Sequence, residues 1–216
     1  MITAKDAEYY SKMVPTYDEQ YEREEIEEDL EDLIEQVQAT LEGHRVLDLA
    51  CGTGYWTNII ADSADYVLGV DINADMIDAA LERGIEEELA GFRVADAFAL
   101  PADLGQFSAI FIGFWWSQVK REDQERLLAH LRKQVGKDTM LVLVDDQYVE
   151  GSSPTVARTD LEGNTHQIAV APDGERYELV KNYPSDSALR KKMASNVREI
   201  KIGRSDYFWA LTCRLK

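Results

Sequence analysis

The chain has 216 residues, 45% of them hydrophobic, and carries 23 Lys and Arg against 41 Asp and Glu. This composition suits one folded domain with a real core and excludes a disordered tail. The formal net charge of −18 repels phosphate backbones and anionic lipid, so we expect no nucleic-acid partner and no membrane surface. No apolar run could span a bilayer and the first residues lack a signal peptide's apolar stretch, which predicts a cytoplasmic protein.

The acidic residues are concentrated near the N-terminus. Residues 18–35 hold eleven acidic side chains and one basic side chain, Arg23. Apolar residues recur within and after this segment at helical spacing, at Ile26, Leu30, Leu33, Ile34, Val37 and Leu41. We therefore predict a helix with one buried stripe and a solvated acidic face, rather than a docking site for a basic partner.

After Gly43, short apolar runs alternate with helical stretches. We predict strands at Arg45–Ala50, Tyr66–Val70, Phe92–Ala95, Phe107–Phe114 and Thr139–Val144. These runs do not alternate between apolar and polar residues, which indicates strands covered on both faces, as in a parallel sheet with helices on either side. The alternation of strand and helix predicts an α/β fold.

The pattern changes beyond Asp146. Two runs, Asn164–Ala171 and Arg176–Tyr183, are joined by a Pro-Asp-Gly-Glu turn, which predicts an antiparallel hairpin. We interpret residues 146–184 as a small inserted cap. The last predicted elements are a helix and a strand, at about Ser185–Ser195 and at Tyr207–Leu215.

The segment Asp48-Leu49-Ala50-Cys51-Gly52-Thr53-Gly54 is the most informative about chemistry. It runs from a buried strand into a tight loop of small residues that opens a helix. Gly52 and Gly54 let a ligand approach the backbone, and the helix N-terminus offers N–H groups to a negatively charged ligand group. Asp71 ends the next strand, where its carboxylate can accept hydrogen bonds from two ribose hydroxyls. The sequence thus predicts a ligand that contains a nucleoside.

Two details argue against a dinucleotide. The dinucleotide fingerprint has a third glycine three residues after the second, whereas that position after Gly54 is Thr57. Asp48, at the end of the first strand, would repel a pyrophosphate but can pair with the ammonium group of a methionine moiety. This combination favours S-adenosylmethionine over the cofactor of a nicotinamide-dependent oxidoreductase.

On these residues the chain resembles the class I S-adenosylmethionine-dependent methyltransferases, in the small-molecule branch related to ubiquinone and menaquinone methyltransferases. The segment 48–54 is similar to the first motif of that family, with Ala50 in place of its usual first glycine. Residues 69–72 resemble the second motif and residues 94–101 the third. The resemblance implies a Rossmann-like fold, with a seven-stranded, mostly parallel sheet, helices on both faces and a small β-hairpin cap.

The same resemblance implies the domain organisation and the cofactor contacts. Residues 1–216 would form a single domain, in which helices from residues 1–42 fold over the cofactor site. Asp96 would accept from the adenine amino group, and the backbone N–H of Ala97 would face the ring. Tyr10 and Tyr17 would either bind the methionine carboxylate or wedge the first helix onto the sheet. The complete set of residues predicted for the cofactor is Tyr10, Tyr17, Asp48, Ala50, Gly52, Gly54, Asp71, Ile72, Met76, Asp96, Ala97 and Phe114.

The acceptor is expected beyond the ends of the fourth and fifth strands, because ligands of open α/β sheets lie outside the carboxyl ends of the strands. We predict that Trp115, Trp116 and Tyr148 line its pocket, although adjacent residues point opposite ways and one tryptophan belongs to the core. Methyl transfer depends mainly on alignment, and a base is needed only for a protonated acceptor. The candidates for that base are Asp145 and His166, and beside them Asp146 and Tyr148. Capping of a turn is the alternative for Asp145, and a structural role is the alternative for His166.

These inferences predict methyl transfer to an oxygen, nitrogen or sulfur atom of a small, aromatic or amphipathic metabolite, with S-adenosylhomocysteine as the second product. We expect a monomer or homodimer that uses no metal, since no Cys/His cluster shows ligand spacing and Cys51 and Cys213 serve as small or core residues. Two alternatives are a protein or peptide methyltransferase and a regulator that binds S-adenosylmethionine without turnover.

Overall fold

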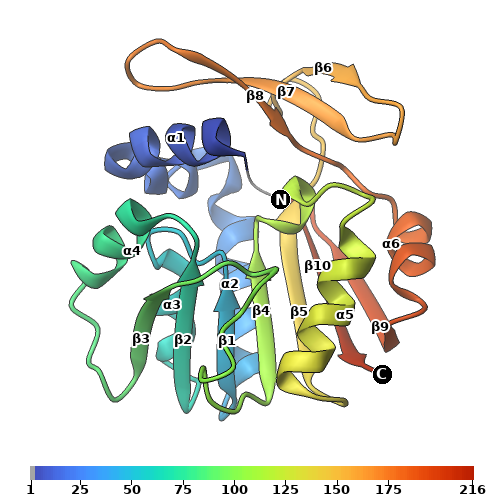
Figure 1. Ribbon diagram of the computed structural model, residues 1–216. Helices are drawn as coiled ribbons and strands as arrows, with labels where there is room; N and C mark the ends of the chain where they lie inside the picture. Colours follow the sequence, from blue (N-terminus) through green and yellow to red (C-terminus); the bar gives the residue numbers. More distant parts are fainter. Residues whose placement is uncertain (1–2) are drawn as a thin grey trace.

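The computed structural model describes residues 3–216 and contains a central sheet of seven strands, in the order β3-β2-β1-β4-β5-β10-β9 (Figure 1). The first five strands are parallel, whereas β10 runs antiparallel to β5 and β9 antiparallel to β10. The strands are β1 (Arg45–Leu49), β2 (Tyr66–Asp71), β3 (Ala90–Val94), β4 (Ala109–Gly113), β5 (Met140–Asp146), β9 (Val197–Arg204) and β10 (Phe208–Leu215). The predicted α/β fold class is confirmed.

Helices cover both faces of this sheet, because each central strand is apolar on both sides. On β1, Val46 packs into one core with α2 and α3, and Leu47 packs into a second core with α5 and α6. In α2 four residues of the predicted apolar stripe are buried, Leu30, Leu33, Val37 and Leu41, and the glutamates face solvent. The helices that cover the sheet are α2 (Glu27–Leu41), α3 (Tyr55–Ala61), α4 (Ala74–Leu81), α5 (Gln124–Val135) and α6 (Asp186–Met193).

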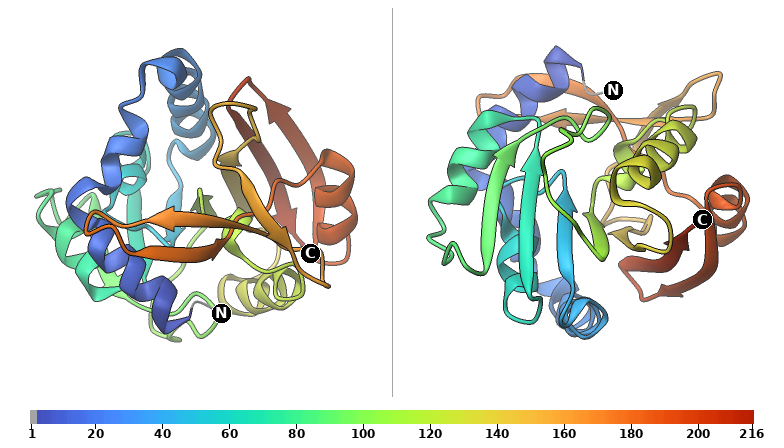
Figure 2. Two further views of the ribbon diagram at one scale, coloured as in Figure 1. Left: turned by 90° about the horizontal axis from the view of Figure 1, so that it is seen from above. Right: turned by 60° about the horizontal axis from the view of Figure 1, so that its bottom comes forward.

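A second, three-stranded antiparallel sheet lies across the carboxyl-end edge of the main sheet (Figure 1). It consists of β6 (Val156–Thr159), β7 (Thr165–Val170) and β8 (Arg176–Val180), so β7 and β8 form the predicted hairpin and β6 adds a strand that we did not predict. The helix α1 (Ala4–Met13) lies between the two sheets (Figures 1 and 2). Short 3₁₀ turns follow it at Val14–Tyr21 and Glu24–Ile26, and another follows β4 at Trp116–Gln118.

The contacts between α1 and the cap sheet are mainly polar. Lys12 forms ion pairs with Asp173 at 2.7 Å and Glu175 at 2.6 Å in the hairpin turn. The Tyr177 hydroxyl donates to Glu8 at 3.0 Å, and the rings of Tyr9 and Tyr177 are 5.4 Å apart. These contacts hold α1 against the cap sheet. Within residues 3–216, each helix is too short or too polar to cross a membrane.

Gly69, on β2, is required by close packing, and its replacement by alanine should destabilise the fold. A Cβ atom there would lie 2.7 Å from the Phe92 ring and 3.0 Å from Cys51 Sγ. We expect the free energy of unfolding to fall by about 1–3 kcal/mol in Gly69→Ala, measured by urea denaturation. The control is Gly203→Ala on β9, where a Cβ atom meets nothing within 4 Å. Equal stability of the two variants would contradict this packing argument.

Candidate active site

The carboxyl ends of β1, β2 and β3 surround one cavity, which we call the loop cavity. Its walls include Ala50 and Gly52 from the loop after β1, Asp71 at the end of β2, and Asp96 and Ala97 after β3. The other predicted cofactor residues that line it are Tyr10, Tyr17, Ile72, Met76 and Phe114. The structure therefore brings together residues from all three motif segments and from the N-terminal segment.

Gly54 and Asp48, the remaining two, lie behind the wall of this cavity. Gly54 has a φ of 76°, and a Cβ atom there would lie 3.0 Å from the Phe92 ring, so this glycine serves the packing of the loop. Asp48 is buried and accepts a hydrogen bond from the Thr57 hydroxyl at 2.6 Å. Burial raises the pKa of Asp48 to about 7, although the Thr57 hydrogen bond opposes this.

The Asp71 carboxylate holds the backbone around the loop cavity. One oxygen accepts from the Gly52 N–H at 3.0 Å, and the other accepts from the Asn73 N–H at 2.8 Å. Burial raises the pKa of Asp71, while these backbone donors lower it. Because each carboxylate oxygen can accept a second hydrogen bond, Asp71 still has capacity for a ligand hydroxyl.

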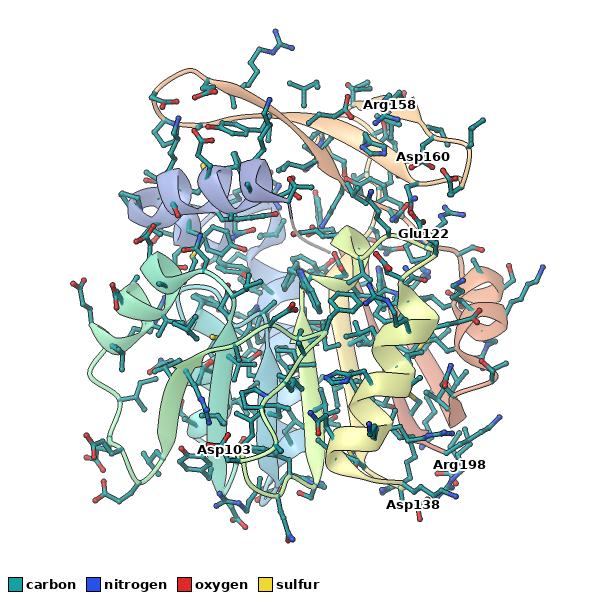
Figure 3. The ribbon with its side chains drawn as sticks, viewed as in Figure 1. Asp103, Glu122, Asp138, Arg158, Asp160 and Arg198 are labelled. Carbon is teal, nitrogen blue, oxygen red and sulfur yellow. The ribbon has the colours of Figure 1, made fainter. Side chains whose placement is uncertain are left out.

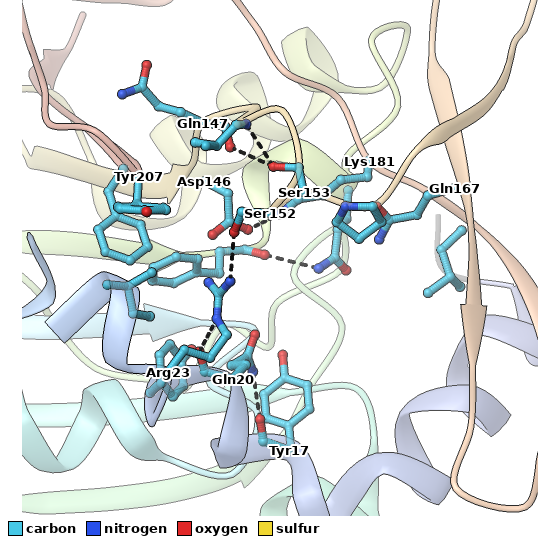
Figure 4. Close-up of a pocket in the computed structure, with 18 of the residues that line it drawn as sticks. Tyr17, Gln20, Arg23, Asp146, Gln147, Ser152, Ser153, Gln167, Lys181 and Tyr207 are labelled. Atoms are coloured by element: carbon cyan, nitrogen blue, oxygen red, sulfur yellow. Dashed lines mark hydrogen bonds and ion pairs between the residues drawn. The ribbon is translucent and has the colours of Figure 1, made fainter.

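A second cavity, of about 500 Å³, lies between the N-terminal segment and the cap sheet, and we call it the cap cavity. Figure 4 shows Lys181 and Gln167 on one side of it and Gln20 and Arg23 on the other. The loop cavity and the cap cavity share four residues, namely Tyr10, Tyr17, Phe114 and Gln118. The two cavities are therefore neighbours that meet at one shared wall.

Hydrogen bonds fix this shared wall. The Tyr10 hydroxyl donates to Gln118 Oε1 at 2.6 Å, and Gln118 Nε2 donates to the Phe114 carbonyl at 3.0 Å. Burial raises the pKa of Tyr10 well above its ordinary value, so this hydroxyl stays protonated. Neither role that we predicted for Tyr10 includes this bond, and sequence reasoning missed Gln118 because its partner is 108 residues away in the chain.

Lys181, just after β8, places a buried positive charge in the cap cavity. Its ammonium group donates to Asp145 at 2.9 Å and to Asp146 at 2.6 Å at the end of β5. Burial alone would lower the pKa of Lys181, but the two carboxylates raise it well above its ordinary value. Lys181 is therefore a permanent cation and not a base. We did not predict this ion pair, because nothing in the sequence around a lysine of a polar hairpin indicates that its charge is buried.

Neither Asp145 nor His166 lines the loop cavity or the cap cavity. Asp145 is fully buried and accepts from the Ser117 N–H and hydroxyl at 2.7 and 2.8 Å, besides Lys181, so its oxygens are occupied. Burial raises its pKa, and the Lys181 charge opposes this. Of the two neighbouring candidates, Asp146 lines the cap cavity and Asp145 does not.

His166 lies on the face of β7 opposite to Gln167, which lines the cap cavity. The His166 ring lies 3.3 Å from Asp160 and 3.4 Å from Glu178. Figure 3 shows Asp160 and Arg158 together at the outer end of the cap. His166 is therefore a buried residue of the cap sheet that does not line the cap cavity, as its structural alternative predicted.

The three residues predicted for the acceptor lie in three different places. Trp115 lines the loop cavity, where its ring meets Phe98 edge-on at 6.2 Å. Trp116 is 1% exposed and belongs to the core formed with α5 and α6. Tyr148 is 48% exposed and contacts Tyr183 at 5.3 Å between ring centres. As predicted, one of the two adjacent tryptophans belongs to the core and the other lines a cavity. None of the three residues lines the cap cavity as the structure describes it.

Comparison with known proteins identifies the class. Residues 46–138 match the family described as "Methyltransferase domain". A demethylmenaquinone methyltransferase of Lactococcus lactis is 35% identical over 79 residues, which cover 34% of this chain and 31% of the relative. A tRNA U34 carboxymethyltransferase of Pseudomonas fluorescens is 31% identical over 156 residues, which cover 69% of this chain and 43% of the relative. The chain thus spans less than half the length of these curated relatives.

Among solved structures, one described as a DhpI–SAH complex aligns with a TM-score of 0.77 and 25% identity, and the alignment covers 97% of this chain and 94% of that one. The matched domain and the shared architecture give this chain the fold of the class I S-adenosylmethionine-dependent methyltransferases. The predicted resemblance to this family is confirmed, and so is the prediction of S-adenosylmethionine as the cofactor.

Proposed function

We propose that the chain transfers a methyl group from S-adenosylmethionine to an oxygen, nitrogen or sulfur atom of a small molecule in the cap cavity. The observation that carries this proposal is the shared wall of Tyr10, Tyr17, Phe114 and Gln118, at which the loop cavity and the cap cavity meet. When bound, S-adenosylmethionine supplies an electrophilic methyl group on a positively charged sulfur. The protein contributes alignment and a largely aromatic wall that excludes water from the place of transfer.

The residues of the loop cavity fit the nucleoside part of the cofactor. We assign Asp71 to the ribose hydroxyls, since its carboxylate faces the cavity and has acceptor capacity left. Ile72 and Met76 supply apolar surface for the adenine ring. Asp96 accepts the Phe98 N–H at 2.8 Å with one oxygen, which leaves the other for the adenine amino group, and Ala97 presents its backbone beside it.

The cap cavity suits a small polar acceptor. Its volume of about 500 Å³ lies in the range of small-molecule sites. The charge of Lys181 favours an acceptor with an anionic or electron-rich group, and Tyr21 and Tyr207 offer aromatic surface to the rest of the molecule. Asp146, beside Lys181, is placed to take a proton from an acceptor that enters protonated.

The acceptor class can be tested by turnover. The protein would be incubated with methyl-labelled S-adenosylmethionine and separate panels of small carboxylic acids, phenols, amines and thiols, with bulk tRNA and a basic peptide in parallel. We expect label in a small molecule and release of S-adenosylhomocysteine. Label only in tRNA or only in the peptide would contradict the proposal. Tight cofactor binding without turnover in any panel would favour a regulator.

A pH dependence of cofactor binding follows if Asp48 pairs with the ammonium group of the cofactor. Burial raises the pKa of Asp48 to about 7, so the ligand-free protein holds a protonated Asp48 at pH 6 and an ionised one at pH 8. Since the ammonium group selects the ionised form, affinity for S-adenosylhomocysteine should rise by up to about tenfold per pH unit below pH 7 and then level off. Calorimetric titrations between pH 5.5 and 8.5 measure this dependence.

The Asp48→Asn variant is the matched control for this pH dependence. It cannot ionise at this position, so its affinity profile should lack the rise that Asp48 causes. The stability of the ligand-free protein should fall with rising pH, whereas the affinity rises. A carboxyl group with a raised pKa contributes most to stability below its ordinary pKa of about 4. This contribution is lost as the pH rises through the folded-state pKa of about 7. Parallel pH profiles for the two proteins would contradict the ion pair.

A further inference from the structure

Three residues of α5 reach the loop after β3 from one face of the helix. Arg126, His130 and Gln134 follow one another at intervals of four residues, so their side chains share that face. We call these three residues the α5 clasp. The loop that they contact, residues 95–101, carries Asp96 at the wall of the loop cavity. The α5 clasp therefore holds a segment of the cofactor site without lining the loop cavity or the cap cavity itself.

Two members of the α5 clasp bind the backbone of Leu100. The Leu100 N–H donates to His130 Nε2 at 3.1 Å, and Gln134 Nε2 donates to the Leu100 carbonyl at 2.5 Å. The Leu100 side chain is buried and is part of the core that contains Leu127 and Leu131 of α5. Side chain and backbone of Leu100 are thus both fixed relative to the helix.

Between β3 and Leu100 the loop is braced internally. One carboxylate oxygen of Asp96 accepts from the Phe98 N–H at 2.8 Å, and the Asp96 carbonyl accepts from the Ala99 N–H at 2.9 Å. The third member of the α5 clasp, Arg126, lies over the Phe98 ring, 4.6 Å from its centre. Because this turn is bonded together, a displacement of Leu100 also displaces Asp96 and Phe98, which both line the loop cavity.

The bond between Leu100 and His130 requires a neutral imidazole. A backbone N–H can only donate, so His130 Nε2 must carry no proton. Burial lowers the pKa of His130 below its ordinary value; the Asp96 carboxylate opposes this, and the charges of Lys133 and Arg126 add to it. At neutral pH the ring is therefore an acceptor for Leu100. A second proton would place two donors, the Leu100 N–H and the Nε2–H, opposite each other.

We propose that His130 is a positioning residue for the adenine end of the cofactor site, and that protonation of its Nε2 atom releases Leu100 and weakens cofactor binding. This inference rests on the proposed function, because it takes Asp96 and its loop as the contact of the adenine ring. The neutral form of His130 predominates above the ordinary histidine pKa of about 6.5 and is lost as the pH falls below it. The cofactor is therefore held less tightly in acid.

The test compares the wild type with His130→Gln by calorimetric titration with S-adenosylhomocysteine, from about pH 8 to about pH 5. A glutamine oxygen can accept from the Leu100 N–H but does not ionise in this range. We expect equal affinities at about pH 8. At about pH 5 the wild type should bind two- to tenfold more weakly than His130→Gln, roughly the effect of one hydrogen bond. A pH dependence caused by Asp48 is common to both proteins and cancels in this ratio.

Two further variants separate positioning from a general effect of removing a histidine. His130→Leu leaves the Leu100 N–H without its acceptor and should bind S-adenosylhomocysteine about tenfold more weakly than the wild type at about pH 8, a loss that His130→Gln does not show. His44→Gln is the matched control, because His44 contacts Ser108 at 2.8 Å at the amino end of β1, away from the loop cavity. It should keep the wild-type pH profile.

The outcomes are distinct. An affinity ratio between the wild type and His130→Gln that stays constant with pH, or an equal change in His44→Gln, would overturn the inference and leave the proposed function intact. Wild-type affinity in His130→Leu would do the same. Failure of the wild type to bind S-adenosylhomocysteine at any pH would overturn the proposed function itself.

Discussion

Replacing Asp71 by alanine is expected to weaken the binding of S-adenosylhomocysteine by about 100-fold or more. Two hydrogen bonds from ribose hydroxyls to an ionised acceptor would be lost, each worth about 1.5–3 kcal/mol. The Gly52 and Asn73 N–H groups would also lose the carboxylate that orients them. The loop would then be less well prepared for the cofactor, which adds to the loss. Calorimetric titration measures the affinity.

Two control variants separate these effects. Asp78→Ala removes an exposed carboxylate from α4 and should leave the affinity unchanged, because it changes the net charge without touching the loop cavity. Asp71→Asn retains an acceptor oxygen and should show a smaller loss than the alanine variant. If Asp71→Ala stayed folded by circular dichroism and bound S-adenosylhomocysteine as the wild type does, the assignment of Asp71 to the ribose would be wrong.

Lys181→Met is expected to lower the free energy of unfolding at pH 7 by about 3–5 kcal/mol, because removal of one partner leaves buried charge uncompensated. Asp145 is fully buried and Asp146 half-buried, and both accept from the Lys181 ammonium group. Lys181 also connects β8 of the cap to β5 of the main sheet, so its loss loosens the cap. Urea denaturation followed by tryptophan fluorescence measures the change.

The pH dependence of this deficit has a defined sign. Burial raises the pKa of Asp145, and Lys181 opposes that rise, so without Lys181 the pKa of Asp145 lies higher still. Protonation removes the uncompensated charge, and the deficit should therefore shrink as the pH falls. Lys12→Met is the control, because Lys12 pairs with carboxylates that are half exposed and should cost at most about 1 kcal/mol. Equal losses in the two variants would refute the buried network.

The sequence predicted the loop cavity well because its chemistry is local. Asp48, Gly52 and Asp71 lie in or beside short segments in which strand, turn and helix start are encoded by neighbouring residues. Once the strands are parallel, their carboxyl ends must meet at one edge of the sheet. The alternation of strands and helices along the chain was therefore enough to predict that these residues lie close together.

The acceptor side depends on contacts between distant parts of the chain. Gln118 and Lys181 gain their roles from Tyr10 and Asp145, which lie 108 and 36 residues away in sequence, and no local pattern reports such partners. That His166 lies away from the cap cavity could not be predicted, because the face of β7 that points to the cavity depends on how the cap docks. Strand β9 escaped prediction because it is an edge strand whose residues are largely exposed or half-buried.

The most direct test of the account is a calorimetric titration of the wild-type protein with S-adenosylhomocysteine and, separately, with nicotinamide adenine dinucleotide. The account predicts one binding site for S-adenosylhomocysteine and none for the dinucleotide, since Asp48 and Thr57 stand where a pyrophosphate site needs a neutral strand end and a glycine. Binding of the dinucleotide without binding of S-adenosylhomocysteine would contradict the assignment of the loop cavity and, with it, the proposed methyl transfer.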